Sequence, residues 1–87
     1  QDIVRIGNHY RDWAEIYMVA HGKAQFILEN IESKERLKPT PTLVTGDRIF
    51  IPAYTGLQII AEKGTVILIA APSAEREKGT HTYNFDD

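Results

Sequence analysis

Hydrophobic and polar residues alternate in several short stretches of the chain. The alternation is clearest at residues 23–29, where Ala24, Phe26 and Leu28 are spaced two apart. This spacing is typical of a β-strand with one buried face. Other strands are predicted at residues 14–20, 48–52, 57–62 and 65–71. About seven short strands separated by turns predict an all-β sandwich or barrel.

Glycine residues mark the expected turns. His21-Gly22 and Lys63-Gly64 each lie between two predicted strands. We expect both to be tight hairpin turns, because glycine readily adopts positive φ angles. Gly46-Asp47 and Tyr54-Thr55-Gly56 predict two further turns.

The evidence for helix is poor throughout, and the sequence allows only single turns, at residues 12–15 and 33–37. The polar connector at 30–38 is predicted to be a mobile loop, since it is charged and followed by Pro39 and Pro41. Residues 73–87 are charged and interrupted by glycine. They are predicted to be either a polar tail or an arm that pairs with another strand or contributes to a dimer.

The composition is that of one ordinary globular domain. The chain has 87 residues, 43% of them hydrophobic and 25% charged, and its core is expected at about residues 5–71. The longest apolar run, residues 66–72, is too short to span a bilayer. A net charge of −2 predicts no nucleic-acid or membrane partner. Cysteine is absent and no secretion signal opens the sequence, although it begins with Gln1; we expect a cytoplasmic protein.

Two segments concentrate the candidate chemistry. His9 is followed by Glu15 and then Gly22, and Gly46-Asp47 is followed by Pro52. In these residues the chain resembles the cupin superfamily, and the resemblance extends over about residues 5–71. It implies a cupin-type jelly roll, either a β-barrel or a double-stranded β-sandwich. Gly7 stands close to the position of the first glycine in the cupin motif.

The sequence departs from the cupin pattern at the metal ligands. By the resemblance, those ligands would be two histidines, a glutamate and a later histidine. His9 and Glu15 match, but Arg11 stands at the second histidine position and Leu57 at the last. Arginine has no lone pair for a cation, and two ligands are too few for zinc or iron(II). We therefore expect no metal and no cofactor.

The remaining polar residues predict a binding site. Alternation places Glu15, Tyr17 and Val19 on one strand face, and Arg11 is expected to neutralise Glu15. Arg11 with His9 suits an anionic or polyhydroxylated ligand. Leu57 would line an apolar wall with Ile59 and Ala61, and Trp13 or Tyr54 would stack on a sugar ring at the rim. The run Gly7-Asn8-His9-Tyr10 is similar to that of cupins of polysaccharide and nucleotide-sugar biosynthesis, which implies carbohydrate chemistry.

Four functions remain open. The leading one is a metal-free cupin domain that binds a polar, anionic or carbohydrate-like small molecule. The second is a metal-independent sugar or nucleotide-sugar isomerase or epimerase, with His9 or Glu15 as base, Tyr17 as acid and Arg11 as enolate stabiliser. A dimerising structural module, in which Arg11–Glu15 is only an ion pair, is the third. A metal enzyme such as a dioxygenase, with ligands His9, Glu15 and His81, is the fourth.

Apolar residues on both strand faces predict a homodimer formed by sheet packing. More apolar residues point away from the expected interior than one small barrel can absorb. They are Ile16, Met18, Ile49, Ile51, Ile60 and Leu68.

Overall fold

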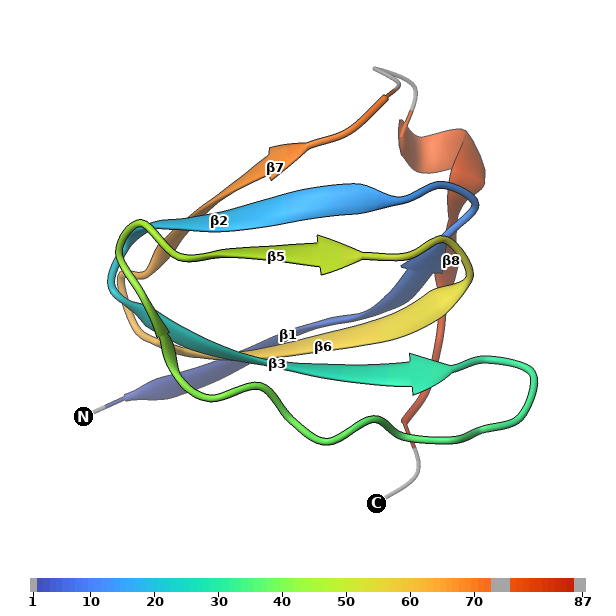
Figure 1. Cartoon of the computed structure of the whole chain (residues 1–87), viewed down its shortest axis with the longest axis horizontal. Helices are drawn as coiled ribbons and strands as arrows, with labels where there is room; N and C mark the ends of the chain where they lie inside the picture. Colours follow the sequence, from blue (N-terminus) through green and yellow to red (C-terminus); the bar gives the residue numbers. More distant parts are fainter. Residues whose placement is uncertain (1, 73–75, 86–87) are drawn as a thin grey trace.

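A computed structural model describes residues 2–72 and 76–85, and it contains two antiparallel sheets (Figure 1). The five-stranded sheet has the order β4-β3-β6-β1-β8 and the three-stranded sheet the order β5-β2-β7. The elements are β1 (Ile3–Arg11), β2 (Glu15–His21), β3 (Lys23–Asn30), β4 (Leu43–Val44), β5 (Arg48–Ile51), β6 (Thr55–Glu62), β7 (Val66–Ala70), the 3₁₀ helix η1 (Arg76–Gly79) and β8 (Thr80–Thr82). The predicted all-β class is confirmed. The sheets form a sandwich, and no strand ladder within the described residues joins them into a barrel.

The predicted hairpins at Gly22 and Gly64 are wrong, because each turn carries the chain from one sheet to the other. β2 and β7 belong to the three-stranded sheet, whereas β3 and β6 pair with each other in the five-stranded sheet. The two turns pack together: the Thr65 hydroxyl donates to the Lys23 carbonyl at 3.1 Å. A Cβ at Gly22 would lie 2.5 Å from Thr65 Oγ1, so glycine is required there for this close approach as well as for its φ of 98°.

β1 is a strand that the hydrophobic pattern did not predict. Gly7 and Asn8 both have positive φ angles, 104° and 55°, and the register against β6 shifts between Gly7 and His9. This bulge interrupts the alternation of side chains on which a sequence-based prediction depends.

The single helical turns that the sequence allows at 12–15 and 33–37 do not form. Residues 12–13 form a bend before β2 begins at Glu15, and residues 31–33 form a turn. The Asn30 side-chain oxygen accepts hydrogen bonds from the amides of Glu32 and Ser33, at 2.9 and 3.0 Å, which favours a turn over a helix. Arg36 then forms an isolated bridge with Glu29 of β3.

The core lies between the two sheets, on the faces that alternation predicts. Its buried hydrophobic residues are Tyr17, Val19, Ala24, Phe26, Ile51, Leu57, Ile59 and Ala61. The rings of Tyr17 and Phe26 meet edge to face, with centroids 5.9 Å apart. Ile49 is partly buried against this core. Ile49 and Ile51 therefore point inward and, contrary to our expectation, do not contribute to an outer apolar face.

The C-terminal segment is an arm in its described part. β8 pairs with β1, so that Tyr10 lies opposite His81. The Tyr83 ring then covers Gly56 of β6, where a Cβ would lie 2.6 Å from the ring, and its hydroxyl donates to Glu29. Residues 73–75 and 86–87 of the predicted arm lie outside the described residues. Over the described part of the chain, we find no helix with the length and apolar character needed to cross a membrane.

Candidate functional site

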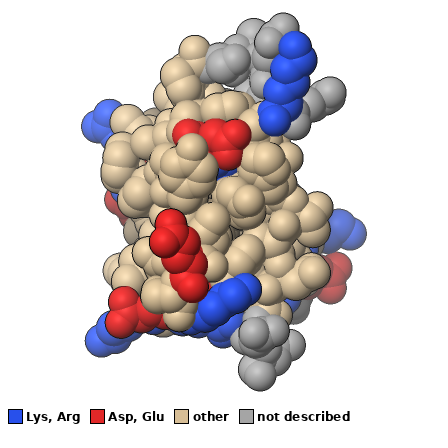
Figure 2. Space-filling model, turned by 90° about the vertical axis from the view of Figure 1, so that its right-hand side faces the viewer, with Lys and Arg blue, Asp and Glu red and all other residues tan. Residues whose placement is uncertain are grey.

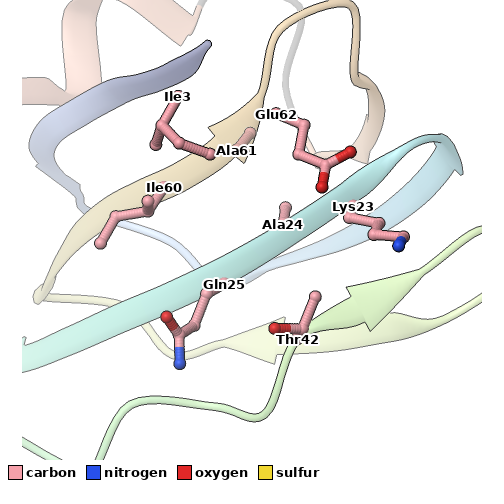
Figure 3. A pocket seen from close by; sticks show the side chains of 8 residues that line it. All are labelled: Ile3, Lys23, Ala24, Gln25, Thr42, Ile60, Ala61 and Glu62. Atoms are coloured by element: carbon pink, nitrogen blue, oxygen red, sulfur yellow. The ribbon is translucent and has the colours of Figure 1, made fainter. Parts of the chain in front are cut away.

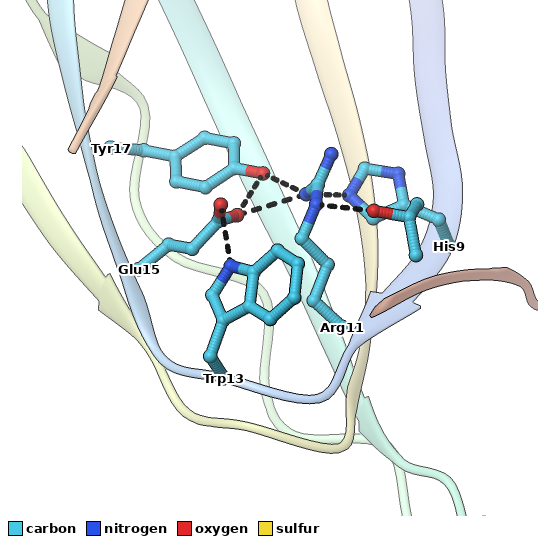
Figure 4. Close-up of polar contacts among 6 residues, drawn as sticks. His9, Arg11, Trp13, Glu15 and Tyr17 are labelled. Carbon is cyan, nitrogen blue, oxygen red and sulfur yellow. Dashed lines mark hydrogen bonds and ion pairs between the residues drawn. The ribbon is translucent and has the colours of Figure 1, made fainter. Parts of the chain in front are cut away.

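Five side chains from β1, β2 and the connection between them meet at one end of the sandwich (Figure 4). We call them the Arg11 cluster; its members are His9, Arg11, Trp13, Glu15 and Tyr17. The structure therefore brings together five of the seven predicted site residues, and a sixth, Leu57, lines the same small cavity.

Arg11 is the centre of the cluster. Its Nη1 atom lies 2.9 Å from Glu15 Oε1 and 2.8 Å from the Tyr17 hydroxyl. The same nitrogen lies 2.5 Å from His9 Nε2, and Nε donates to the Thr80 hydroxyl at 3.0 Å. The predicted ion pair with Glu15 is confirmed. Nη2 has no hydrogen-bond partner among the described residues.

Glu15 is a buried carboxylate whose two oxygens both accept hydrogen bonds. Oε1 accepts from Arg11 and from the Tyr17 hydroxyl, the latter at 3.0 Å. Oε2 accepts from the Trp13 indole nitrogen at 3.1 Å. Burial of a carboxylate is unfavourable without such partners, so these contacts are what allow a charged residue at this position.

The hydrogen bonds define the protonation of two cluster members. A guanidinium only donates, so His9 Nε2 is the acceptor and a neutral imidazole carries its proton on Nδ1. Burial, opposed by the charge of Arg11 and reinforced by Glu15, raises the pKa of Tyr17 to about 12. Tyr17 is therefore a protonated phenol at neutral pH, which matches its donation to Glu15.

The cavity beside the cluster has a volume of about 10 Å³, room for about one water molecule. The side chains themselves fill the interior. Within the described residues, no three histidine, aspartate or glutamate side chains are grouped so as to hold a metal ion. His81 is separate from the cluster: it stacks on Tyr10 at 4.8 Å and contacts Asp12 at 3.0 Å. The ligand set His9, Glu15 and His81 is therefore not assembled.

Tyr54, the seventh predicted site residue, lies outside the cavity but next to it. It is 53% exposed and lines a hollow of about 350 Å³. The other lining residues are Asn30, Glu32, Glu35, Leu37, Pro52, Ala53 and Thr55. Pro52 and Thr55 also line the inner cavity, and the Tyr54 amide donates to the Arg11 carbonyl at 2.8 Å. We call this the Tyr54 hollow.

Sequence reasoning missed the loop residues of the Tyr54 hollow and the contact of Thr80 with Arg11. Leu37 and Glu35 belong to a polar connector with no periodic pattern, and Thr80 is 69 residues from Arg11. No local signal connects them with the cluster. Figure 2 shows this end of the molecule, where acidic and basic side chains are interspersed with uncharged surface.

A comparison with protein family models finds no match. Comparisons with curated proteins and with solved structures find no significant similarity either.

A separate hollow of about 160 Å³ lies over β3 and β6 (Figure 3). It is lined by Ile3, Lys23, Ala24, Gln25, Thr42, Ile60, Ala61 and Glu62. It contains none of the predicted site residues and no aromatic side chain. The Arg11 cluster with the Tyr54 hollow is the better candidate site.

Proposed function

We propose that this chain is a cupin-like small-molecule-binding domain that takes a polar, carbohydrate-like ligand in the Tyr54 hollow, above the Arg11 cluster. The strand order supports the cupin-like part. The chain passes repeatedly from one sheet to the other, as a double-stranded jelly roll requires. The meeting of His9, Arg11, Glu15 and Leu57 around one cavity supports the alignment with the cupin motif.

The observation that carries the proposal is the exposed Tyr54 ring in a hollow joined to the polar cluster. A volume of about 350 Å³ falls within the range of small-molecule sites, about 300–1,000 Å³. Tyr54 offers a flat apolar face, and Asn30 and Thr55 offer hydrogen-bonding groups beside it. The Tyr54 amide donates to the Arg11 carbonyl, so the backbone of the central cluster residue also positions Tyr54.

Charge favours an uncharged polyhydroxylated ligand over an anion at this site. The ion pair with Glu15 offsets the positive charge of Arg11. Glu32 and Glu35 also line the hollow and would repel an anion. Sugar hydroxyls, in contrast, both donate to carboxylates and accept from amides.

The isomerase alternative is less well supported. Its candidate base, His9, and its candidate acid, Tyr17, both contact Arg11 Nη1. A substrate carbon would need the place that this nitrogen occupies, and the cavity has room for only about one water molecule. The filled interior also fits the third alternative, a dimerising structural module. The binding test below distinguishes that module from a small-molecule-binding domain.

We also propose a homodimer that forms through the outer face of the three-stranded sheet, and a cytoplasmic location consistent with the lack of cysteine. Ile16, Phe50 and Leu68 are 44%, 59% and 53% exposed on this face. Phe50 lies opposite Ile16, and Leu68 lies opposite Met18. Together these side chains form an apolar surface suited to a second copy.

The test of the binding proposal is an NMR titration with methyl glycosides and short oligosaccharides. We expect NMR shifts at residues of the Tyr54 hollow. Tyr54→Ala should weaken binding by about two- to tenfold, because loss of aromatic stacking costs about 0.5–1.5 kcal/mol. Phe50→Ala, which removes an aromatic ring exposed on the opposite sheet, is the matched control and should bind as the wild type. No shifts with any sugar, or equal losses in both variants, would favour the structural module.

A further inference from the structure

A second polar hollow lies on the face of β1 and β6 that points away from the core. Its lining residues are Arg5, Asn8, Gln58, Asn84 and Phe85, and its volume is about 470 Å³. Leu57 and Ile59 are buried, so the alternation of β6 directs Gln58 outward. None of these residues belongs to the Arg11 cluster or the Tyr54 hollow. We call it the outer polar hollow.

Hydrogen bonds orient the amide groups in this hollow. Arg5 Nη1 donates to Gln58 Oε1 at 3.4 Å, and Gln58 Nε2 donates to Asn8 Oδ1 at 3.0 Å. The Asn8 oxygen is therefore directed toward Gln58, which leaves the Asn8 amide nitrogen available. That nitrogen and the Asn84 side chain have no hydrogen-bond partner among the described residues.

The backbone holds Asn8 in an uncommon conformation. Its φ of 55° is in the left-handed region, which few residues other than glycine adopt. Asn8 is the residue at which the register of β1 against β6 shifts, between Gly7 and His9, and such β-bulges accommodate unusual backbone conformations. The Tyr83 amide donates to the Asn8 carbonyl at 2.9 Å, and this bond holds Asn84 and Phe85 beside the hollow.

We propose that the outer polar hollow binds an oxyanion, the carboxylate or phosphate group of a small molecule. Its available polar groups include the Arg5 guanidinium and the amide nitrogens of Asn8 and Asn84. Among the residues that the structure describes, no aspartate or glutamate lines it. A guanidinium with neighbouring N–H donors matches the several acceptor lone pairs of an oxyanion. This proposal does not depend on the sugar site, because the two hollows share no residue.

The first test is an NMR titration with inorganic phosphate, acetate and, as an uncharged probe, methyl glucoside. Phosphate or acetate should shift the NMR signals of Asn8, Gln58 and Asn84. The anion that binds more tightly identifies whether the hollow recognises a phosphate or a carboxylate. Arg5→Gln should weaken binding at least about fivefold, since bonds to charged groups are the strong ones. Arg48→Gln removes the same charge from an exposed position on β5 and should change nothing. Equal losses in both variants, no shifts with either anion, or equal shifts with methyl glucoside would overturn the proposal.

A second variant separates binding from folding. Asn8→Gly removes the amide and relieves the positive φ, so the thermal midpoint should stay the same or rise. Oxyanion binding should nevertheless weaken about three- to tenfold, because one donor is lost. A variant that keeps full affinity would show that Asn8 is not part of a site, and the proposal would fail.

Discussion

The guanidinium of Arg11 shares one nitrogen among three side chains, so its removal affects each of them differently. Glu15 would lose its ion-pair partner while remaining buried, with only 3% of its side chain exposed. His9 would lose the donor that faces Nε2, and Tyr17 would keep its bond to Glu15. The loss of the positive charge beside this buried carboxylate is the most unfavourable of these changes.

We predict that Arg11→Met lowers the free energy of unfolding by about 3–5 kcal/mol, the usual effect of breaking a buried pair. An 87-residue domain has a total stability of about 4–13 kcal/mol, so this loss is a large part of the whole. Urea unfolding followed by fluorescence of Trp13 measures the difference.

The double variant Arg11→Met/Glu15→Gln tests whether the buried charge causes this loss of stability. It removes the buried charge and should recover most of the loss, because neutral groups need less compensation. Arg48→Met, at an exposed site, is the control and should differ from the wild type by less than about 0.5 kcal/mol. A loss below about 1 kcal/mol in Arg11→Met would contradict a buried ion pair in solution.

The stability that the C-terminal arm contributes depends on pH through Glu29, the acceptor of its Tyr83 hydroxyl. The Tyr83 hydroxyl, opposed by burial and assisted by Arg36, lowers the pKa of Glu29 below its usual 4.5. The folded state therefore binds this proton less readily than the unfolded state. The stabilisation is complete above about pH 5 and is lost as the pH falls through the lowered pKa.

We predict that Tyr83→Phe lowers the unfolding free energy at pH 7 by about 2 kcal/mol, the value of a hydrogen bond to a charged group. The difference in unfolding free energy between variant and wild type should narrow below about pH 4, once Glu29 is protonated in the folded and the unfolded state. Tyr10→Phe removes a hydroxyl that has no described partner and is the matched control. A gap that stays constant from pH 7 to about pH 2 would contradict the role of Glu29.

At the scale of the element, side-chain alternation predicted which face of a strand a residue occupies better than it predicted which strands pair. It correctly directed Glu15 and Tyr17 inward, because successive residues of any strand face opposite sides. It could not show that β2 and β3 belong to different sheets, since a glycine turn between two strands permits a hairpin or a crossover. Distant residues decide between a hairpin and a crossover; here Thr65 packs against Gly22.

The same limit explains what was and was not predictable in the candidate site. The Arg11 cluster comes from one short segment, residues 9–17, so spacing alone could bring its members together. The Tyr54 hollow joins that end of the sandwich to the 30–37 loop, which packs there through long-range contacts. β1 was missed because Gly7 and Asn8 interrupt its pattern.

At the scale of the whole molecule, the two outer faces differ in character. The outer face of the three-stranded sheet carries Phe50, Ile16 and Leu68. The outer face of the five-stranded sheet carries the polar Arg5, Gln25 and Gln58 beside Ile3 and Ile60, and the arm covers one end of it. Association of two copies should therefore use the three-stranded sheet.

We predict that Phe50→Glu prevents formation of the proposed homodimer while the chain stays folded, because Phe50 is exposed and its replacement leaves the core unchanged. Sedimentation equilibrium measures the mass, and circular dichroism measures the fold. Leu37→Glu introduces the same charge on an exposed loop residue and should leave the dimer intact. A wild-type chain that sediments as a monomer at high concentration would exclude the dimer.

The repeated crossings between the sheets also determine when the chain can fold. Among the described strands, β3 alone pairs with the strand that directly follows it, and β1 must wait for β6, since Ile3 pairs with Glu62. Sandwiches dominated by such distant pairings fold in about milliseconds to seconds. At about 5–20 residues per second of synthesis, Ile3, Val4 and Ile6 remain without their partner strand for several seconds on the ribosome. Among the described strands, β1 is thus the one left longest exposed to aggregation and to chaperone binding.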